Sequence, residues 1–106
     1  MFSLELSTPA KEYFEDLKNY LINNFNEKKR KAVLDEEDKK LKNLKSFPEL
    51  GIDAVKYSPL LAGYRALVDK KEYIFYRVNK DEKIISVELI VSTKEDLGRK
   101  IQKYFA

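Results

Sequence analysis

The longest run of strand-forming residues lies between Gly63 and Val91, where apolar and aromatic positions are interrupted by two short polar breaks. The breaks, Asp69–Lys71 and Asn79–Glu82, divide the run into three segments of strand length. Connections this short join antiparallel neighbours, because a parallel crossover needs a dozen or more residues. The pattern therefore predicts a three-stranded β-meander, with the rest of the chain covering one of its faces.

A strand and a helix are predicted before the meander. Apolar and polar residues alternate over Phe2–Ser7, which predicts a half-buried strand that pairs with the edge of the meander. Thr8 and Pro9 are typical of a helix start, with Thr8 as the cap. The apolar side chains that follow are spaced by three and four residues, and we interpret this stripe as core. Its members are Ala10, Tyr13, Phe14, Leu17, Leu21 and Phe25.

Charged residues dominate the next segment, Glu27–Lys45, which contains neither Gly nor Pro. Its apolar stripe is thin, so we expect a largely solvated helix that runs antiparallel to the first as an α-hairpin. The consecutive cations Lys28–Lys31 suggest a nucleic-acid contact, but the carboxylates of Asp35–Asp38 follow and offset much of their field. We interpret the cations as a solvated helix face, with a contact to phosphate as the alternative.

The remaining segments end the hairpin and follow the meander. Pro48 and Gly51 in Phe47–Gly51 end the second helix. The pattern of the connection 52–62 predicts no particular secondary structure, but four of its apolar residues could anchor it to the core. These anchors are Ile52, Val55, Leu60 and Leu61. Ser92–Glu95 has capping-box spacing and precedes an amphipathic helix over 96–105, which Gly98 weakens by about 1 kcal/mol relative to alanine.

These elements predict one α+β domain over residues 1–106. We expect an antiparallel sheet of about four strands, the N-terminal strand plus the meander, packed on the helical hairpin. A short C-terminal helix completes the domain.

Composition limits the available chemistry. Lys and Arg number 21 against 18 Asp and Glu, and the net charge of +3 does not by itself demand a nucleic-acid partner. The chain has no cysteine and no histidine, so it lacks thiolate ligands, the usual zinc ligand and the usual base at neutral pH. We expect no metal and no cofactor. With no signal-peptide pattern and no apolar run of about 20 residues, we expect a cytoplasmic protein without membrane contact.

Two arginines, Arg65 and Arg77, stand within the apolar strands of the predicted meander. Strand alternation allows both to face solvent on an open side of the sheet. The alternative is a functional basic surface, which the arginines form together with Lys71 and Lys94. Three tyrosines would be interleaved with it: Tyr64, Tyr73 and Tyr76.

Four segments, taken in this order, carry a resemblance to a known family. They are Phe47–Gly51 after the hairpin, Gly63–Arg65 opening the meander, Glu72–Val78 as its central strand, and Ile90–Asp96 at its exit. With them the chain resembles the RelE/ParE superfamily of toxins from bacterial type II toxin–antitoxin systems, over nearly its whole length. The resemblance implies a growth inhibitor that a cognate antitoxin protein silences in a hetero-oligomer.

The family implies two activities on one scaffold. RelE-like members cut mRNA in the ribosomal A site, and this chemistry would give catalytic roles to Arg65, Tyr73 and Lys94. Ser92 and Glu95 stand where the RNA-cutting exit motif has a histidine and an arginine, which leaves Lys94 as the exit cation. ParE-like members inhibit DNA gyrase by binding it, and Arg77 directly after the aromatic strand is more similar to that branch.

The favoured hypothesis is therefore a ParE-like toxin that acts on DNA gyrase, with Arg65, Arg77, Lys71 and Tyr64 contacting the target. The first alternative is a RelE-like, ribosome-dependent and metal-independent mRNA endoribonuclease, and the second is a basic RNA-binding module. A different target or a degenerate toxin also stays open. We expect the antitoxin to contact the C-terminal helix. The residues expected to make this contact are Leu97, Ile101, Tyr104 and Phe105.

Overall fold

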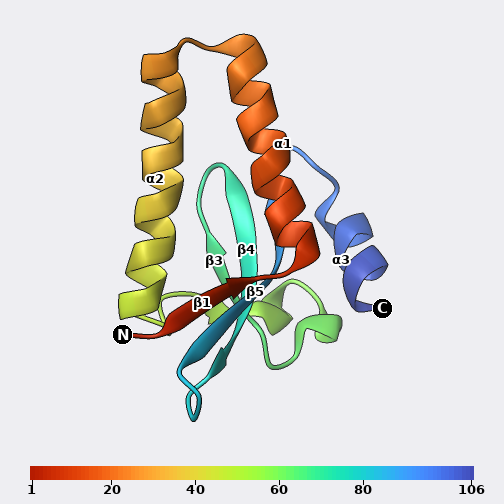
Figure 1. Ribbon diagram of the computed structural model, residues 1–106. Helices are drawn as coiled ribbons and strands as arrows, with labels where there is room; N and C mark the ends of the chain where they lie inside the picture. The colour runs from red at the N-terminus through yellow and green to blue at the C-terminus, as the bar shows by residue number, and fades with distance from the viewer.

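The computed structural model describes residues 1–106 and arranges five strands into one sheet of order β1-β5-β4-β3-β2. The strands are β1 (Ser3–Leu6), β2 (Ile52–Asp53), β3 (Arg65–Val68), β4 (Glu72–Asn79) and β5 (Ile84–Ser92). The helices are α1 (Thr8–Asn24), α2 (Glu27–Ser46) and α3 (Leu97–Phe105), with 3₁₀ turns η1 (Ala54–Lys56) and η2 (Pro59–Leu61). The predicted α+β class and its order of elements are confirmed (Figure 1).

The predicted meander is confirmed as β3, β4 and β5, which pair antiparallel. The predicted N-terminal strand is also present, but β1 pairs with β5 in parallel, so the prediction of a wholly antiparallel sheet is wrong at this edge. Alternation of side chains fixes which face of a strand is buried and says nothing about its direction. The short-connection rule applies only to consecutive strands, and β1 and β5 are far apart in the chain.

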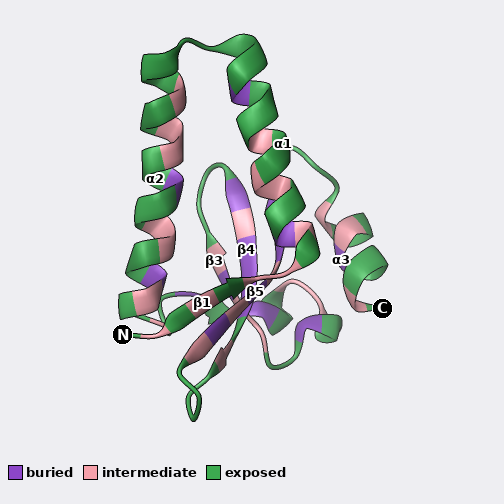
Figure 2. Ribbon diagram, viewed as in Figure 1, coloured by how far each residue is buried: buried purple, intermediate pink, exposed green.

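The sheet is covered on both faces, which corrects the expectation of an open side. One face packs on the helical hairpin, and its core contains Ala10, Leu44, Ile74, Tyr76, Ile85, Val87 and Ile90. The other face packs on the 3₁₀ turns and α3, and its core contains Ala54, Leu61, Ala66, Phe75, Leu89, Val91 and Ile101. The buried positions of Figure 2 gather on the strands and on the sides of the helices that face them.

A β-bulge in β5 serves both cores. Phe75 pairs with Leu89 while the next residue, Tyr76, pairs with Val87, so Glu88 is the extra residue. Val87 packs in the hairpin-side core, whereas Leu89 packs in the core under α3. The bulge therefore changes which alternate positions of β5 face each side.

The helix starts differ from the predicted ones. Ser7, and not Thr8, is the N-cap of α1: its hydroxyl accepts a hydrogen bond from the Ala10 amide at 3.2 Å. The same hydroxyl donates to the bulged Glu88 carbonyl at 2.6 Å, which ties the start of α1 to β5. Asp96, and not Ser92, caps α3 by accepting from the Arg99 amide at 3.1 Å. Ser92 is instead the last residue of β5.

The apolar stripe of α1 is only partly buried. Ala10 and Leu21 are buried, and Tyr13, Phe14 and Leu17 are half-buried. Phe25 is 39 % exposed, because the hairpin extends past the sheet (Figure 1). In the connection before the meander, Leu61 is buried as predicted, whereas the other three predicted anchors are exposed. Those exposed residues are Ile52, Val55 and Leu60. The 3₁₀ turn η1 buries Ala54 in their place.

Candidate functional site

Arg65 and Tyr76 hold the loop that follows the hairpin. The Arg65 guanidinium donates to the Gly51 carbonyl at 2.7 Å and 3.1 Å and to the Glu49 carbonyl at 3.2 Å. The Tyr76 hydroxyl donates to the Pro48 carbonyl and accepts from the Gly51 amide, both at 2.8 Å. Burial raises the pKa of Tyr76, so the phenol stays neutral and can donate. Because Tyr76 is completely buried, it is not part of any surface.

The two meander arginines lie on opposite faces of the sheet. Arg65 is directly opposite Tyr76 in the β3–β4 register and shares its face, the hairpin side. Arg77 is the next residue of β4, so its side chain points to the other face. The interpretation in which Arg65 and Arg77 belong to one basic surface is therefore wrong.

Arg77 lies in a cluster on the α3 side of the sheet. Its guanidinium carbon is 5.2 Å from the centroid of the Tyr64 ring, and Nη2 lies 3.3 Å from the Glu88 carboxylate. The Tyr64 ring meets Phe105 of α3 edge-on, with centroids 5.0 Å apart. The Arg77 side chain is still 57 % exposed. We call Tyr64, Arg77, Glu88 and Phe105 the arginine–tyrosine patch.

The residues expected to act in RNA cleavage do not meet. Arg65 pairs opposite Tyr76, while Lys94 follows Ser92, which pairs with Glu72 at the other end of β4. Along β4, the backbone positions of Glu72 and Tyr76 are four residues apart, which corresponds to roughly 13 Å. Tyr73 lies on the α3 side of the sheet, where its ring stacks on Phe75 with centroids 6.2 Å apart.

The two predicted functional lysines lie at the end of the meander. Lys71 Nζ contacts a Glu36 carboxylate oxygen at 2.9 Å, and this hydrogen bond lowers the pKa of Glu36. Lys94 is exposed, and its side chain lines a groove between the hairpin and the end of β5. Lys71 borders the same groove, so the structure brings these two cations together and leaves Arg65 and Arg77 elsewhere.

The expected antitoxin contacts on α3 are largely occupied within the chain itself. Ile101 is 2 % exposed and belongs to the core, while Leu97 and Phe105 are half-buried against it. Tyr104 is the exposed member of the four, at 37 %. The predicted helix is thus docked, and its apolar face is covered by the sheet.

The cationic run at the start of α2 makes local contacts. Lys31 pairs with Asp35 at 2.8 Å, and the Arg30 guanidinium donates to the Phe25 carbonyl at 2.8 Å at the end of α1. Lys28 and Lys29 are exposed. These contacts agree with a solvated helix face.

A buried charged cluster at the root of the hairpin was not predicted. Lys40 Nζ lies 2.8 Å from Glu72 Oε2 and 3.4 Å from Glu37 Oε1, and it also pairs with Asp69. The Tyr13 hydroxyl donates to Glu72 Oε1 at 2.7 Å. Glu37 and Glu72 are 4 % and 2 % exposed. We call these five residues the hairpin-root cluster.

The residues of the hairpin-root cluster shift one another's pKa values. Burial, followed by the hydrogen bond and charge of Glu72, raises the pKa of Glu37 to about 8. Burial works against the charge of Lys40, but its hydrogen bonds to Asp69 and Glu72 outweigh that effect and raise its pKa. One sequence signal pointed here: Glu37 falls at the four-residue spacing between Val33 and Leu41, within the apolar stripe of α2.

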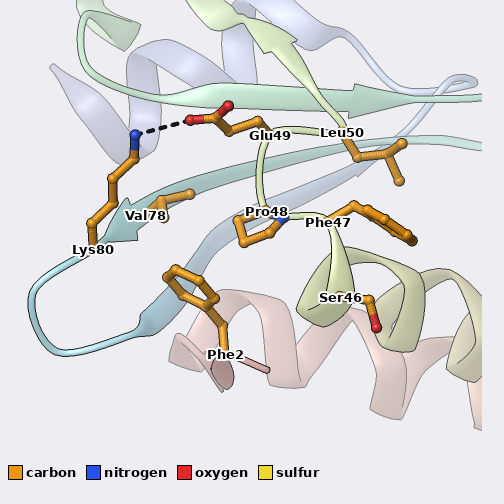
Figure 3. Close-up of a pocket in the computed structure, with 8 residues that line it drawn as sticks. All are labelled: Phe2, Ser46, Phe47, Pro48, Glu49, Leu50, Val78 and Lys80. Carbon is orange, nitrogen blue, oxygen red and sulfur yellow. Dashed lines mark ion pairs between the residues drawn. The ribbon is translucent and has the colours of Figure 1, made fainter.

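An apolar hollow of about 600 Å³ lies beside the loop that Arg65 and Tyr76 hold (Figure 3). Its apolar lining comes from Phe2, Phe47, Pro48, Leu50 and Val78. Lys80 and Glu49 pair across its rim at 3.0 Å. Phe47 is 65 % exposed although its loop is fixed by five side-chain hydrogen bonds and one cap.

The comparisons with known proteins agree with this fold. Residues 4–97 match the family described as the ParE toxin of the type II toxin–antitoxin system parDE. No curated protein matches the chain. None of its helices has the length and apolar character needed to cross a membrane. Because the match spans β1 to the start of α3, the chain belongs to the ParE toxin family, within the RelE/ParE superfamily of type II toxin–antitoxin toxins.

Proposed function

We propose that this toxin inhibits DNA gyrase by binding it, and that it has no ribonuclease centre. The observation that carries the proposal is the separation of Arg65, Tyr73 and Lys94. RNA cleavage needs its base, acid and phosphate-binding cations within hydrogen-bond reach of one phosphodiester. Here Tyr73 lies on the opposite face of the sheet from Arg65, and Lys94 lies at the far end of β4. Binding requires no such convergence.

The arginine–tyrosine patch is the target-binding surface we favour. It presents an exposed guanidinium stacked on an aromatic ring, and arginine and tyrosine are enriched among residues that dominate binding energy at interfaces. Arg65 is less suited to contact a target because its guanidinium is engaged by the Gly51 and Glu49 carbonyls. Lys71 is paired with Glu36 and contributes mainly charge.

The family also implies a cognate antitoxin as partner. We propose that the antitoxin contacts α3 through Tyr104 and the half-buried edges of Leu97 and Phe105. Ile101 would take part only if α3 lifts from the sheet, because it is buried in the core. In this arrangement Phe105 links the antitoxin contact to the target patch through Tyr64.

The proposal is tested by inducing the chain in cells and following two readouts. Supercoiling of a reporter plasmid reports on gyrase, and primer extension on ribosome-bound mRNA reports on cleavage. We expect loss of negative supercoiling with intact mRNA, and growth should recover when the neighbouring gene supplies the antitoxin. Codon-phased cleavage with normal supercoiling would instead establish the ribonuclease alternative.

A purified system separates direct from indirect effects. Gyrase and relaxed plasmid are mixed with the toxin, and supercoiling is followed on a gel. Direct inhibition should appear without ribosomes or RNA. If gyrase works normally at toxin concentrations well above those of the enzyme, the gyrase proposal fails.

A further inference from the structure

The groove that Lys71 and Lys94 border has a volume of about 660 Å³. It runs between the two helices of the hairpin and ends at the hairpin-root cluster. Its apolar lining lies toward the hairpin tip and consists of Leu17, Tyr20, Leu21, Phe25 and Val33. Its root is lined by Tyr13, Glu37 and Glu72. The rim at the root carries the basic side chains of Lys70, Lys71 and Lys94. An apolar wall and a polar root therefore share one continuous hollow.

Within the hairpin-root cluster, carboxylates outnumber cations. The other charged residues that line the groove are of both signs: Asp16 and Glu95 are acidic, Lys29 and the three rim lysines are basic, and Glu36 pairs with Lys71. Lys40 is the cation that contacts the Glu37, Asp69 and Glu72 carboxylates. Three carboxylates and one ammonium give a formal charge of −2 when all are ionised. Two of the three carboxylates are almost fully buried, where an uncompensated charge is costly.

One atom in this cluster lacks a donor. Glu37 Oε2 is buried and is the one buried side-chain polar atom of the chain without a hydrogen-bond partner. Glu37 also lines a second hollow of about 320 Å³, together with Lys40 and Asp69. Buried polar atoms are normally satisfied, and Glu37 is one of the residues that line the groove, so its orphan oxygen is a place for a hydrogen-bond donor.

In the free protein a proton takes that place. Glu37 has a pKa of about 8, so at neutral pH it is mostly protonated and the cluster holds one negative charge less. A cation that paired with the Glu37 carboxylate could therefore replace this proton. Lys40 shows that an ammonium group fits among these carboxylates, because its Nζ contacts Glu37, Asp69 and Glu72. The cation we consider is therefore an ammonium or the chemically similar guanidinium.

We infer that the root of this groove accepts one lysine or arginine side chain of the antitoxin, which pairs with Glu37 and displaces a proton. The inference rests on the family's antitoxin partner and is independent of the gyrase proposal. Apolar residues of the same antitoxin segment would lie on the α1 and α2 walls toward the tip. Lys70 and Lys94 make no ion pair within the chain, so acidic residues should flank the inserted cation.

The test uses the antitoxin encoded by the neighbouring gene, identified by its rescue of growth. Binding is measured at pH 7.0 by interferometry for affinity and by calorimetry in phosphate and in Tris for protons released. Wild-type toxin should release about one proton per complex. Glu37→Gln preserves the shape of the side chain, removes repulsion with Glu72 and cannot release that proton. It should weaken binding at least about tenfold and abolish the proton release.

Asp38→Asn is the matched control. Asp38 is the next residue of α2, but its side chain is 63 % exposed and pairs with Lys42 at the surface. The affinity and the proton count should match wild type. Circular dichroism of Glu37→Gln should show a folded protein, since Gln fits without strain. Unchanged affinity of Glu37→Gln, or proton release that persists in it, would overturn the inference.

The cation itself is identified from the antitoxin side. Each lysine and arginine of the antitoxin is changed to methionine, and affinity is measured for wild-type and Glu37→Gln toxin. One of these substitutions should cost affinity with the wild-type toxin and cost little with Glu37→Gln, as a double-mutant cycle requires. Additive effects at every lysine and arginine would contradict the site. Neither assay contains gyrase, so failure here leaves the target proposal standing.

Discussion

Tyr76 shows how one residue of the meander acts on a distant loop. Its hydroxyl accepts from the Gly51 amide and donates to the Pro48 carbonyl, so Tyr76→Phe leaves a buried amide without an acceptor. We expect a loss of about 1–3 kcal/mol in the free energy of unfolding, measured by urea denaturation. Tyr20→Phe is the control, because its hydroxyl makes no hydrogen bond in the chain and the ring is 55 % exposed. Equal stabilities for the two variants would contradict this account of the loop.

Glu37 makes the stability of the toxin depend on pH in an unusual direction. Its folded pKa of about 8 lies above its ordinary value of 4.5, so the folded state keeps a proton that the unfolded chain releases. Its contribution is therefore complete below pH 4.5 and is lost as the pH rises toward 8. The chain has no histidine or cysteine, the side chains whose ordinary pKa values fall in or next to this window.

The expected result is a free energy of unfolding that falls between pH 5 and pH 8, measured by urea denaturation at half-unit steps. Glu37→Gln should flatten this slope. The lowered pKa values of Glu36, Glu49 and Asp69 act below the window, where acid removes their contribution. Wild-type stability that is constant from pH 5 to pH 8 would show that Glu37 is ionised in the folded toxin.

At the scale of elements, the sequence predicts the helices and the meander well, because the apolar residues of each recur with a strong local periodicity. The α1–α2 hairpin and the β3–β5 meander appear within a few residues of the predicted bounds. What local periodicity could not supply was relative placement. The direction of β1, the two-residue strand β2 and the bulge at Glu88 depend on partners distant in the chain. The packing of α3 on the second face of the sheet likewise depends on residues distant in the chain.

Two glycines give a paired test of the elements around them. Gly98 lies in α3, where an added Cβ would find only ordinary contact with Asp96 at 3.7 Å. Gly98→Ala should raise the free energy of unfolding by about 0.5–1 kcal/mol, because alanine favours the helix. Gly63 has open space around it but a φ of +86°, so Gly63→Ala should lower that free energy by about 1 kcal/mol through backbone strain. Thermal unfolding should show shifts of opposite sign, and shifts of the same sign would refute this assignment.

The candidate sites were harder to predict, for a reason that belongs to the whole molecule. Arg65 and Arg77 differ by one position in the register and therefore face opposite sides, although the sequence suggests one basic surface. Lys71 and Lys94 line one groove, because the turn after β3 and the exit of β5 lie at the same end of β4. The hairpin-root cluster needs contacts between α1, α2 and the meander. In the sequence it is indicated only weakly, by the position of Glu37 within the apolar stripe of α2.

The gyrase proposal places function in the arginine–tyrosine patch and not in Lys94. Arg77→Ala removes the guanidinium stacked on Tyr64 and should abolish growth arrest and loss of supercoiling. The fold should persist, because Arg77 is exposed and its pair with Glu88 is worth less than about 1 kcal/mol. Lys94→Ala, an exposed cation at the other site, should leave both effects nearly intact. Thermal unfolding and circular dichroism of each variant confirm that the protein is folded. If Lys94→Ala abolishes toxicity while Arg77→Ala preserves it, the active surface is the groove and not the patch.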